Sequence, residues 1–568
     1  MDSNSALKIM VVGDSISHGR EGDWTWRYRL WEWLNQQHVS FCFVGPYKGT
    51  VPPEDPEPPR PPPLVPEPPR PGSPRTTGGY ARGVSPAFLA NSDHFSASGR
   101  QAMQAKELVA EQIAAHQPDI CLVELGFNDL GWWVSGPHDT LASMKRLVDQ
   151  ARSIKPDLRF AIANVPHRTL LPGREDLARD TDTYNLLLSA AIPAWSTEES
   201  PISLVRFCEN YSCGEHQSDA AYDGLHPNAL GDYELAQAFS RTLVADFRIG
   251  HTELRIPGTI PPRPQQVPSN FKAAPSPSGI VVTWDAVYGA YWYDLRVRPA
   301  GSDNWSVQYV ASNRYDTAPC ESGQKWEYQV RMRCGDNVKS AWSDVVSAVA
   351  HPNTLPAPPR IFTHATADGF RISWDSYPDR EGVDCYGVYA FDQDIPGSYP
   401  CGVGMRGDGG YMDGLVPGHH YAIAVQTWNG AGGGLLGGAR AVTVGRGTPL
   451  PPVRLQLIVV NRTTAELRWR GDPIAAGYRV FIRRNFVTPA SAESSEVCNV
   501  TVTKTADGLN ERALLRDLFP SVWEWEFAVS GYNGNDESDV SQWILAPPSV
   551  TESDSIRINL ALSTQETP

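Results

Sequence analysis

The sequence lacks any long apolar run, and its basic residues are outnumbered by acidic ones. It has 49 lysines and arginines against 64 aspartates and glutamates, a formal net charge of −15, and the basic residues form no block. Proteins that bind nucleic acids concentrate basic side chains on one face, so no nucleic-acid partner is expected. No apolar run approaches the roughly 18 residues of a membrane-spanning helix, so no membrane span is expected either.

Cysteine is also scarce, with nine residues in a chain of 568. Six of them lie in three locally spaced pairs: Cys208 with Cys213, Cys320 with Cys334, and Cys385 with Cys401. Such pairs form disulfides in an oxidising compartment and stay reduced in a reducing one, and both outcomes are left open. The first apolar run ends at Gly13 and belongs to a predicted strand, so we expect no signal peptide in this sequence.

The first 250 residues alternate short apolar runs with longer stretches of helical period. This alternation predicts parallel βα units, with one doubly wound sheet covered by helices on both faces. The predicted strands span 7–13, 40–45, 119–125, 159–165 and 203–208. The predicted helices span 24–37, 100–116, 138–154, 180–195 and 228–248. At about 150 residues per domain, the chain has room for two or three further domains.

Three polar motifs stand at the ends of these predicted elements. GDSIS (13–17) follows the first strand, GFND (126–129) follows the third, and DGLHPN (223–228) precedes the last helix. The carboxyl ends of parallel strands meet at one edge of a sheet, so we expect these motifs to lie together. A Gly-Asp-Ser triplet alone is ordinary turn chemistry after a strand. The coincidence of three motifs favours a nucleophilic serine.

The residue types in these motifs fit nucleophilic catalysis. Ser15 is the candidate nucleophile, His226 is the candidate base, and Asp223 is close enough along the chain to orient the imidazole. The Ser15 backbone N–H and the Asn128 side-chain amide are candidate donors to an oxyanion. This chemistry needs no metal and no cofactor, and we predict neither. Asp14 and Asp129 are expected to brace their loops through nearby backbone N–H groups.

The three motifs resemble blocks I, III and V of the SGNH hydrolases, also called GDSL-type esterases, and are most similar to the branch with carbohydrate (acetyl xylan) esterases. The resemblance implies a three-layer, flavodoxin-like α/β SGNH hydrolase domain over 1–250. It also implies catalysis by Ser15, Asp223 and His226 through an acyl-enzyme, with Asn128 as an oxyanion donor.

Two parts of this site are less sharply defined by the sequence. The family's second block supplies a glycine N–H to the oxyanion, and Gly99 is the best match, with Gly79 and Gly83 as alternatives. Trp132 and Trp133 follow the GFND motif and are candidates for substrate binding. Packing over the domain edge is the alternative for both tryptophans, because their large rings tend to be buried.

A proline-rich insertion interrupts the predicted domain at 51–74. Pro-Glu-Pro-Pro-Arg-Pro occurs there twice, at 56–61 and 66–71, which predicts extended polyproline II and neither helix nor sheet. Residues 60–66 also fit a peptide of the kind that SH3 domains bind. We expect a solvated, unstructured insertion next to the site.

The second half of the chain changes to short alternating strands and repeats itself. After a proline-rich linker at 251–263, Trp284, Trp374 and Trp469 recur in similar strand patterns. This predicts three β-sandwiches, at 264–351, 356–447 and 449–548, followed by a disordered tail at 549–568. The repeats resemble fibronectin type III domains, and 415–421 and 518–525 resemble their tyrosine corner. These module types and the cysteine pairs favour an extracellular protein, but without a signal peptide the localisation is left unassigned.

The sequence thus predicts a serine esterase that hydrolyses acyl esters, above all acetyl esters, of a small molecule or a carbohydrate polymer. A lysophospholipase or thioesterase would use the same chemistry on another substrate. A different alternative is a surface adhesion protein whose sandwiches bind a polysaccharide or a cell-surface ligand, because such modules usually space or bind.

Overall fold

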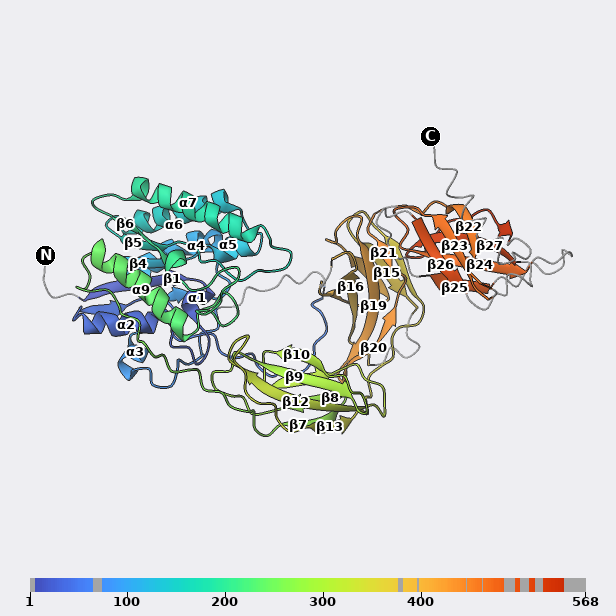
Figure 1. Ribbon diagram of the computed structural model, residues 1–568, viewed down its shortest axis with the longest axis horizontal. Helices are drawn as coiled ribbons and strands as arrows, with labels where there is room; N and C mark the ends of the chain where they lie inside the picture. The colour runs from blue at the N-terminus through green and yellow to red at the C-terminus, as the bar shows by residue number, and fades with distance from the viewer. Residues whose placement is uncertain are drawn as a thin grey trace.

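The computed structural model describes residues 6–64, 74–375, 382–395, 398–445, 447–461, 463–484, 496–500, 510–515 and 525–545. The chain folds around four hydrophobic cores that follow one another in sequence. Figure 1 shows the first part with its helices and sheet, followed by three parts built of strands. The predicted turn at 518–520 and the predicted tail at 549–568 lie outside the described residues.

The first part, here called the α/β domain (β1 to α9), has a parallel sheet in the order β2-β1-β4-β5-β6, with β3 also pairing with β1. Its strands are β1 (Leu7–Gly13), β2 (Phe41–Phe43), β3 (Phe95–Ser96), β4 (Ile120–Glu124), β5 (Arg159–Ala163) and β6 (Ile202–Val205). Its longer helices are α2 (Trp26–Gln36), α4 (Ala102–His116), α6 (Pro137–Ile154), α7 (Leu177–Trp195) and α9 (Ala229–Ala245). Helices α4, α6 and α7 lie on one face of the sheet, and α2 and α9 lie on the other (Figure 1). The predicted parallel α/β fold is confirmed.

The sequence analysis missed the short elements of this domain. They are α1 (Ser15–His18), α3 (Pro86–Ala90), α5 (Phe127–Gly131), α8 (Phe207–Asn210) and strand β3. Elements of two to five residues are too short to show a period of 3.6 or 2 in the sequence. No helix among the described residues is long and apolar enough to span a bilayer.

The second half forms antiparallel sheets in three successive pairs. The first sandwich contains β7 (Lys272–Ser276), β8 (Gly279–Thr283), β9 (Trp292–Pro299), β10 (Ser306–Val310), β11 (Arg314–Thr317), β12 (Lys325–Arg333) and β13 (Val346–Val349). The second contains β14 (Ile361–Ala365), β15 (Phe370–Trp374), β16 (Cys385–Asp392), β17 (Cys401–Met405), β18 (Gly409–Met412), β19 (His420–Asn429), β20 (Gly432–Gly438) and β21 (Val442–Thr443). The third contains β22 (Val453–Val459), β23 (Ala465–Arg470), β24 (Gly477–Arg484), β25 (Glu496–Val500), β26 (Asn510–Leu515), β27 (Trp525–Asn533), β28 (Asp536–Glu537) and β29 (Ile544–Leu545).

Each sandwich is built around a buried tryptophan that packs against a tyrosine of the facing sheet. The pairs are Trp284 with Tyr293, Trp374 with Tyr386, and Trp469 with Tyr478, with ring centroids 5.2, 4.7 and 5.3 Å apart. Such pairs add to the stability gained from burying the rings. In the second sandwich the Tyr421 hydroxyl accepts a hydrogen bond from the Val416 N–H at 3.1 Å. The predicted repeat is therefore visible in the packing.

The six cysteines of the three sequence pairs are free thiols. Cys213 and Cys320, for example, donate to the backbone carbonyls of Gly224 and Thr317. No disulfide therefore joins these six cysteines in the part of the chain that the structure describes.

The proline-rich insertion does not remain wholly solvated, which corrects the sequence prediction. Pro62, Pro63 and Leu64 lie against the edge of the second sandwich, where the Gly404 N–H donates to the Pro63 carbonyl at 2.7 Å. A Cβ on Gly404 would lie 2.4 Å from the Pro62 carbonyl oxygen, so only glycine allows this approach. The prediction of a solvated segment rested on composition alone. Composition does not show whether a proline segment packs against another part of the chain. The second repeat of the insertion, at 66–71, lies outside the described residues.

Candidate active site

Ser15 lies at the carboxyl edge of the parallel sheet, directly after β1. Asp14 caps the short helix α1, with its Oδ1 accepting a hydrogen bond from the Ile16 N–H at 2.9 Å. This turn leaves the Ser15 side chain half-buried at the start of α1, whereas the residues around it are buried. The turn is therefore what presents the serine hydroxyl at the edge of the sheet.

The loop between α8 and α9 brings Asp223 and His226 to Ser15. His226 Nε2 lies 2.8 Å from Ser15 Oγ, and His226 Nδ1 lies 2.7 Å from Asp223 Oδ2. Asp223 Oδ1 also accepts the backbone N–H groups of Leu225 and His226, at 3.2 and 2.8 Å. A histidine that donates from Nδ1 to a carboxylate has a lone pair on Nε2 for the serine proton. This arrangement is able to deprotonate a serine during nucleophilic attack.

The surroundings of Asp223 hold its carboxyl in the charged form. Burial by itself would raise the pKa of Asp223. The nearby His226 imidazole and the hydrogen bonds to His226 and Leu225 act more strongly together, so the pKa lies below the ordinary value of 3.8. A charged carboxylate at this position fixes the imidazole orientation and stabilises an imidazolium.

Gly99 lies in the loop after β3, beside the end of the catalytic strand. Ser96 pairs with Gly13, and the Ala97 N–H donates to the Gly13 carbonyl at 3.1 Å. Gly99 has a φ of +76° and no atom within 4 Å of the place where a Cβ would stand. The loop that carries Gly99 therefore lies beside the end of β1, and the Gly99 backbone takes a left-handed conformation.

The two alternative glycines, Gly79 and Gly83, have different surroundings. A Cβ on Gly79 would lie 2.4 Å from the Tyr288 hydroxyl of the first sandwich, and one on Gly83 would lie 3.3 Å from Trp24. Gly79 thus lies at the contact with the first sandwich and Gly83 lies beside Trp24, whereas Gly99 follows the strand that pairs with the end of β1.

Asn128 lies in helix α5, next to Asp14. Its Nδ2 donates to Asp14 Oδ2 and to the Arg100 carbonyl, each at 3.1 Å. Its Oδ1 accepts the Trp132 indole N–H at 2.9 Å. The amide is thus fixed in one orientation, and an oxyanion would have to share an N–H that is already bonded within the protein.

Trp132 and Trp133 form an exposed aromatic rim after α5. Trp132 is 52% exposed and Trp133 is 68% exposed. The Arg174 guanidinium lies 4.3 Å from the centre of the Trp133 ring. Trp132 therefore lies beside Asn128 and orients its amide, whereas the Arg174 guanidinium covers one face of the Trp133 ring.

Sequence analysis missed a buried pair of carboxyl groups under this site. Glu124, the last residue of β4, interacts with Asp14, and its Oε2 accepts the Ser17 hydroxyl at 2.9 Å. Burial raises the pKa of Glu124 well above its ordinary value and that of Asp14 to about 6. The signal in the sequence is an acidic residue ending an otherwise apolar strand, Ile-Cys-Leu-Val-Glu.

The pair makes stability depend on pH. Because the pKa of Asp14 is about 6 in the folded state against an ordinary value of 3.8, the folded protein binds more protons than the unfolded chain between these values. This stabilisation is present below pH 3.8 and is lost as the pH rises to about 6, by up to about 3 kcal/mol. Glu124→Gln removes the second acid, so the melting temperature of the α/β domain should fall less between pH 4 and 7.

The comparison is made by calorimetry on the full chain. Glu198→Gln, at an exposed carboxyl of the same domain, is the control and should follow the wild-type pH dependence. Identical pH dependence in Glu124→Gln and wild type would show that the carboxyl pair does not carry this effect.

Asp129 braces its loop, as predicted. Its carboxylate accepts the backbone N–H groups of Ala102 at 2.7 Å and Met103 at 3.0 Å, at the start of α4. Burial raises the pKa of this carboxyl, and these N–H groups oppose the rise. Asp129 thus links the GFND loop to the helix that follows Gly99.

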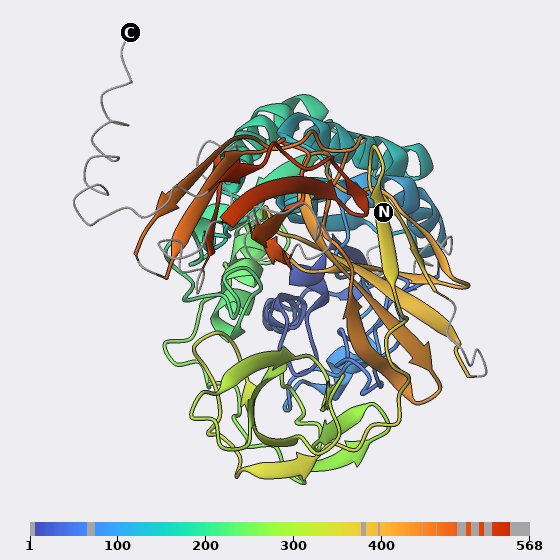
Figure 2. The same ribbon diagram turned by 90° about the vertical axis from the view of Figure 1, so that its right-hand side faces the viewer.

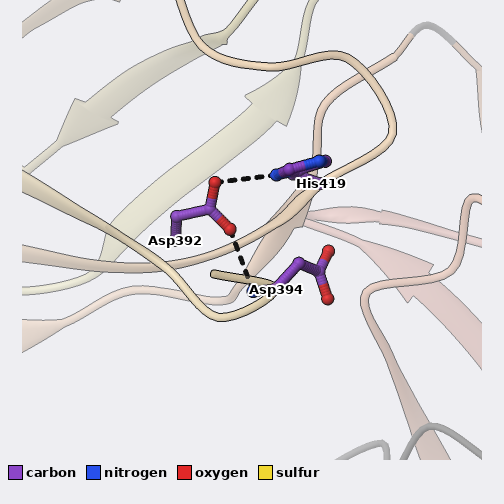
Figure 3. Close-up of side chains that lie close together, drawn as sticks. All are labelled: Asp392, Asp394 and His419. Carbon is purple, nitrogen blue, oxygen red and sulfur yellow. Dashed lines mark hydrogen bonds and ion pairs between the residues drawn. The ribbon is translucent and has the colours of Figure 1, made fainter. Parts of the chain in front are cut away.

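Among the described residues, one group of metal-ligating side chains lies close together, in the second sandwich (Figure 3). Ligand atoms of Asp392, Asp394 and His419 are all within 4.8 Å of one another. Asp392 Oδ2 is 2.8 Å from His419 Nδ1, and Asp394 Oδ2 is 3.0 Å from His420 Nδ1. These pairs join the end of β16 to the start of β19, which accounts for the cluster as a structural brace.

A cavity of about 570 Å³ lies between the α/β domain and the first sandwich. Tyr222 and Asn228, from the catalytic loop, contribute to its lining, whereas Ser15 and His226 do not. The side chains of Asp223 and His226 are 27% and 25% exposed. The reacting groups therefore lie at an open edge outside this cavity.

Comparison with known proteins identifies the α/β domain. Residues 65–232 match the GDSL-like Lipase/Acylhydrolase family. The matched region includes GFND and DGLHPN, whereas GDSIS lies before it.

Solved structures were also compared with the chain. A carbohydrate esterase family 3 protein from Talaromyces cellulolyticus is 20% identical, with 42% of this chain and 96% of that chain covered and a TM-score of 0.30. A Clostridium thermocellum family 3 carbohydrate esterase is 21% identical, with 43% and 98% covered and a TM-score of 0.31. The chicken CNTN1 FN1–FN3 domains are 15% identical, with 50% and 98% covered and a TM-score of 0.18.

TM-scores this low do not assign a fold or a function to this chain. The family match to residues 65–232 is the comparison that assigns the domain. The chain therefore carries a GDSL/SGNH-type lipase/acylhydrolase domain, and the protein is an ester hydrolase.

Proposed function

We propose that the protein is a serine esterase that uses Ser15, His226 and Asp223 as a catalytic triad. The observation that carries this proposal is the continuous set of short contacts from Asp223 Oδ2 through the His226 ring to Ser15 Oγ. The same three residue types, in this bonding order, catalyse acyl transfer on unrelated folds. The fold alone would not be sufficient support for the activity.

The proposed reaction proceeds through an acyl-enzyme. Ser15 Oγ attacks the ester carbonyl while His226 Nε2 accepts its proton, and the Ser15 and Gly99 N–H groups and the Asn128 amide stabilise the oxyanion. His226 then gives the proton to the leaving alcohol. A water molecule, deprotonated by His226, attacks the acyl-enzyme and releases the acid.

We assign the substrate as an acetyl ester of a carbohydrate. The GDSIS and DGLHPN motifs support an acetylated carbohydrate as substrate, because they resemble the motifs of carbohydrate esterases. The exposed rings of Trp132 and Trp133 near the site also fit it, because tryptophan faces pack against apolar faces of other rings. A lysophospholipid or thioester substrate is the alternative, and acyl chain length distinguishes the two.

We further propose that the strand-rich half consists of three fibronectin type III-like modules at 264–351, 356–447 and 449–548. The repeated tryptophan–tyrosine pairs and the Tyr421 hydrogen bond to Val416 support this assignment. Residues 1–250 then form the hydrolase domain and 251–263 the linker. A polysaccharide or a cell-surface ligand is the proposed partner of these modules.

Covalent labelling tests the proposed nucleophile. A fluorophosphonate should label the full chain once, and peptide mapping should place the label on Ser15, because an activated serine attacks phosphorus as it attacks an acyl carbonyl. A label on any other residue would contradict the proposal. Hydrolysis of p-nitrophenyl acetate, butyrate and longer esters should decline with chain length for an acetylesterase and rise for a lipid-directed enzyme.

A further inference from the structure

The catalytic histidine is one layer of a stack of rings that ends in the first sandwich. Tyr222 lies directly before Asp223, and its ring is stacked on His226, with centroids 5.6 Å apart and planes at 17°. Tyr222 also stacks on Tyr291, with centroids 3.7 Å apart and planes at 18°. Tyr291 lies one residue before β9 of the first sandwich. The His226 ring is therefore connected to another domain through a single tyrosine.

The backbone of the catalytic loop is also bonded to the first sandwich. The Tyr222 N–H donates to the His226 carbonyl at 2.9 Å, which closes the loop around Asp223. The Tyr222 carbonyl accepts the Asp336 N–H of the first sandwich at 2.8 Å. Movement of this sandwich would therefore move the loop that carries both Asp223 and His226.

Tyr291 is itself held in place by a buried ion pair. Its hydroxyl donates to Asp23 Oδ1 at 2.8 Å, and Arg263 Nη1 lies 2.7 Å from the same oxygen. The Arg263 guanidinium lies 4.0 Å from the centre of the Tyr291 ring, and Arg20 Nη1 donates to the Tyr291 carbonyl at 3.1 Å. Asp23 and Tyr291 are 6% and 4% exposed. Separating these domains would leave a buried charge unpaired, so the contact is expected to persist.

We propose that Tyr291 of the first sandwich is a positioning residue of the esterase, and that this sandwich is a required part of the catalytic unit. The inference rests on the proposed role of His226. Tyr291 keeps Tyr222 against the imidazole, and the stacked rings keep His226 Nε2 within hydrogen-bond distance of Ser15. A displacement of about 1 Å at such a contact lowers the rate strongly, because proton transfer requires close alignment.

The test compares three variants of the full chain. Tyr291→Leu removes the ring from the stack and is expected to lower kcat for p-nitrophenyl acetate roughly tenfold, with KM changed less than about twofold. Fluorophosphonate labelling of Ser15 should slow by a similar factor. Tyr291→Phe keeps the ring and should restore kcat to near the wild-type value. Tyr288→Leu is the matched control, because the Tyr288 hydroxyl donates to the Tyr80 carbonyl across the same interface.

The inference is overturned if Tyr291→Leu keeps the wild-type kcat, or loses no more than Tyr288→Leu. It is also overturned if Tyr291→Phe loses as much as Tyr291→Leu, since the hydroxyl rather than the stack would then matter. Should Tyr291→Leu fail to fold, Tyr291→Met fills a similar volume without a ring and serves in its place. Failure of the proposed function is distinguishable, because wild type itself would then not be labelled at Ser15.

Discussion

Ser15→Ala is expected to abolish ester hydrolysis, with kcat reduced by about 10⁶-fold, the loss that follows removal of a triad serine. Alanine lacks the oxygen that lies 2.8 Å from His226 Nε2, so no acyl-enzyme forms. Residual hydrolysis would come only from water attacking a carbonyl that the oxyanion donors polarise. The measurement is the rate of p-nitrophenyl acetate hydrolysis by purified full-length protein.

The matched control for this variant is Ser98→Ala. Ser98 is an exposed serine in the loop after β3, and its backbone N–H, which alanine keeps, donates to His18 Nδ1, so wild-type activity is expected. An unchanged melting temperature of Ser15→Ala would show that lost activity does not come from lost folding. Substantial hydrolysis by folded Ser15→Ala would rule out this serine as the nucleophile.

Much of the α/β domain could be predicted because its elements are long enough to show a period. The runs ending at Gly13 and Glu124 are mostly apolar, as is typical of strands covered on both faces. Because parallel strands end at one edge, the GDSIS and GFND motifs could be brought together without coordinates. The spacing of Asp223 and His226 in one loop predicted their contact directly.

The rest of the site depends on contacts that leave no periodic signal. Glu124 pairs with Asp14 across neighbouring strands, and a single acid at the end of an apolar run does not reveal its partner. Gly99 was the best match in the sequence, but its place beside the end of β1 became visible only with the pairing of β3 and β1. The stack of Tyr222 on Tyr291 joins two domains whose relative position no local pattern encodes.

The proline-rich insertion and the first sandwich both make contacts that the sequence did not predict, and for the same reason. Composition predicted a solvated insertion and an independent module, because proline content and strand alternation describe a segment by itself. The contacts of Pro63 with Gly404, and of Tyr291 with Tyr222, show that these segments meet other parts of the chain. The hydrolase domain is therefore enclosed by neighbours on at least one side of its catalytic loop.

Asn128→Ala is expected to lower kcat for p-nitrophenyl acetate by about 10² to 10³, the cost of losing one side-chain oxyanion donor. Asn128 Nδ2 lies 3.1 Å from both Asp14 Oδ2 and the Arg100 carbonyl, so its N–H groups point into the region between α1 and the loop after Gly99. As negative charge develops on the substrate oxygen, a shared N–H gains a stronger acceptor than the neutral Arg100 carbonyl. The ground-state ester offers no such gain, so KM should change little.

The control separates this loss from a change in folding. Asn35→Ala, at an exposed asparagine on α2, should retain wild-type activity. Asn128→Asp keeps the shape of the side chain but replaces the donor by an acceptor and adds charge beside Asp14, so it should be at least as slow as Asn128→Ala. If Asn128→Ala remained within about threefold of wild type, the backbone N–H groups of Ser15 and Gly99 would have to stabilise the oxyanion without it.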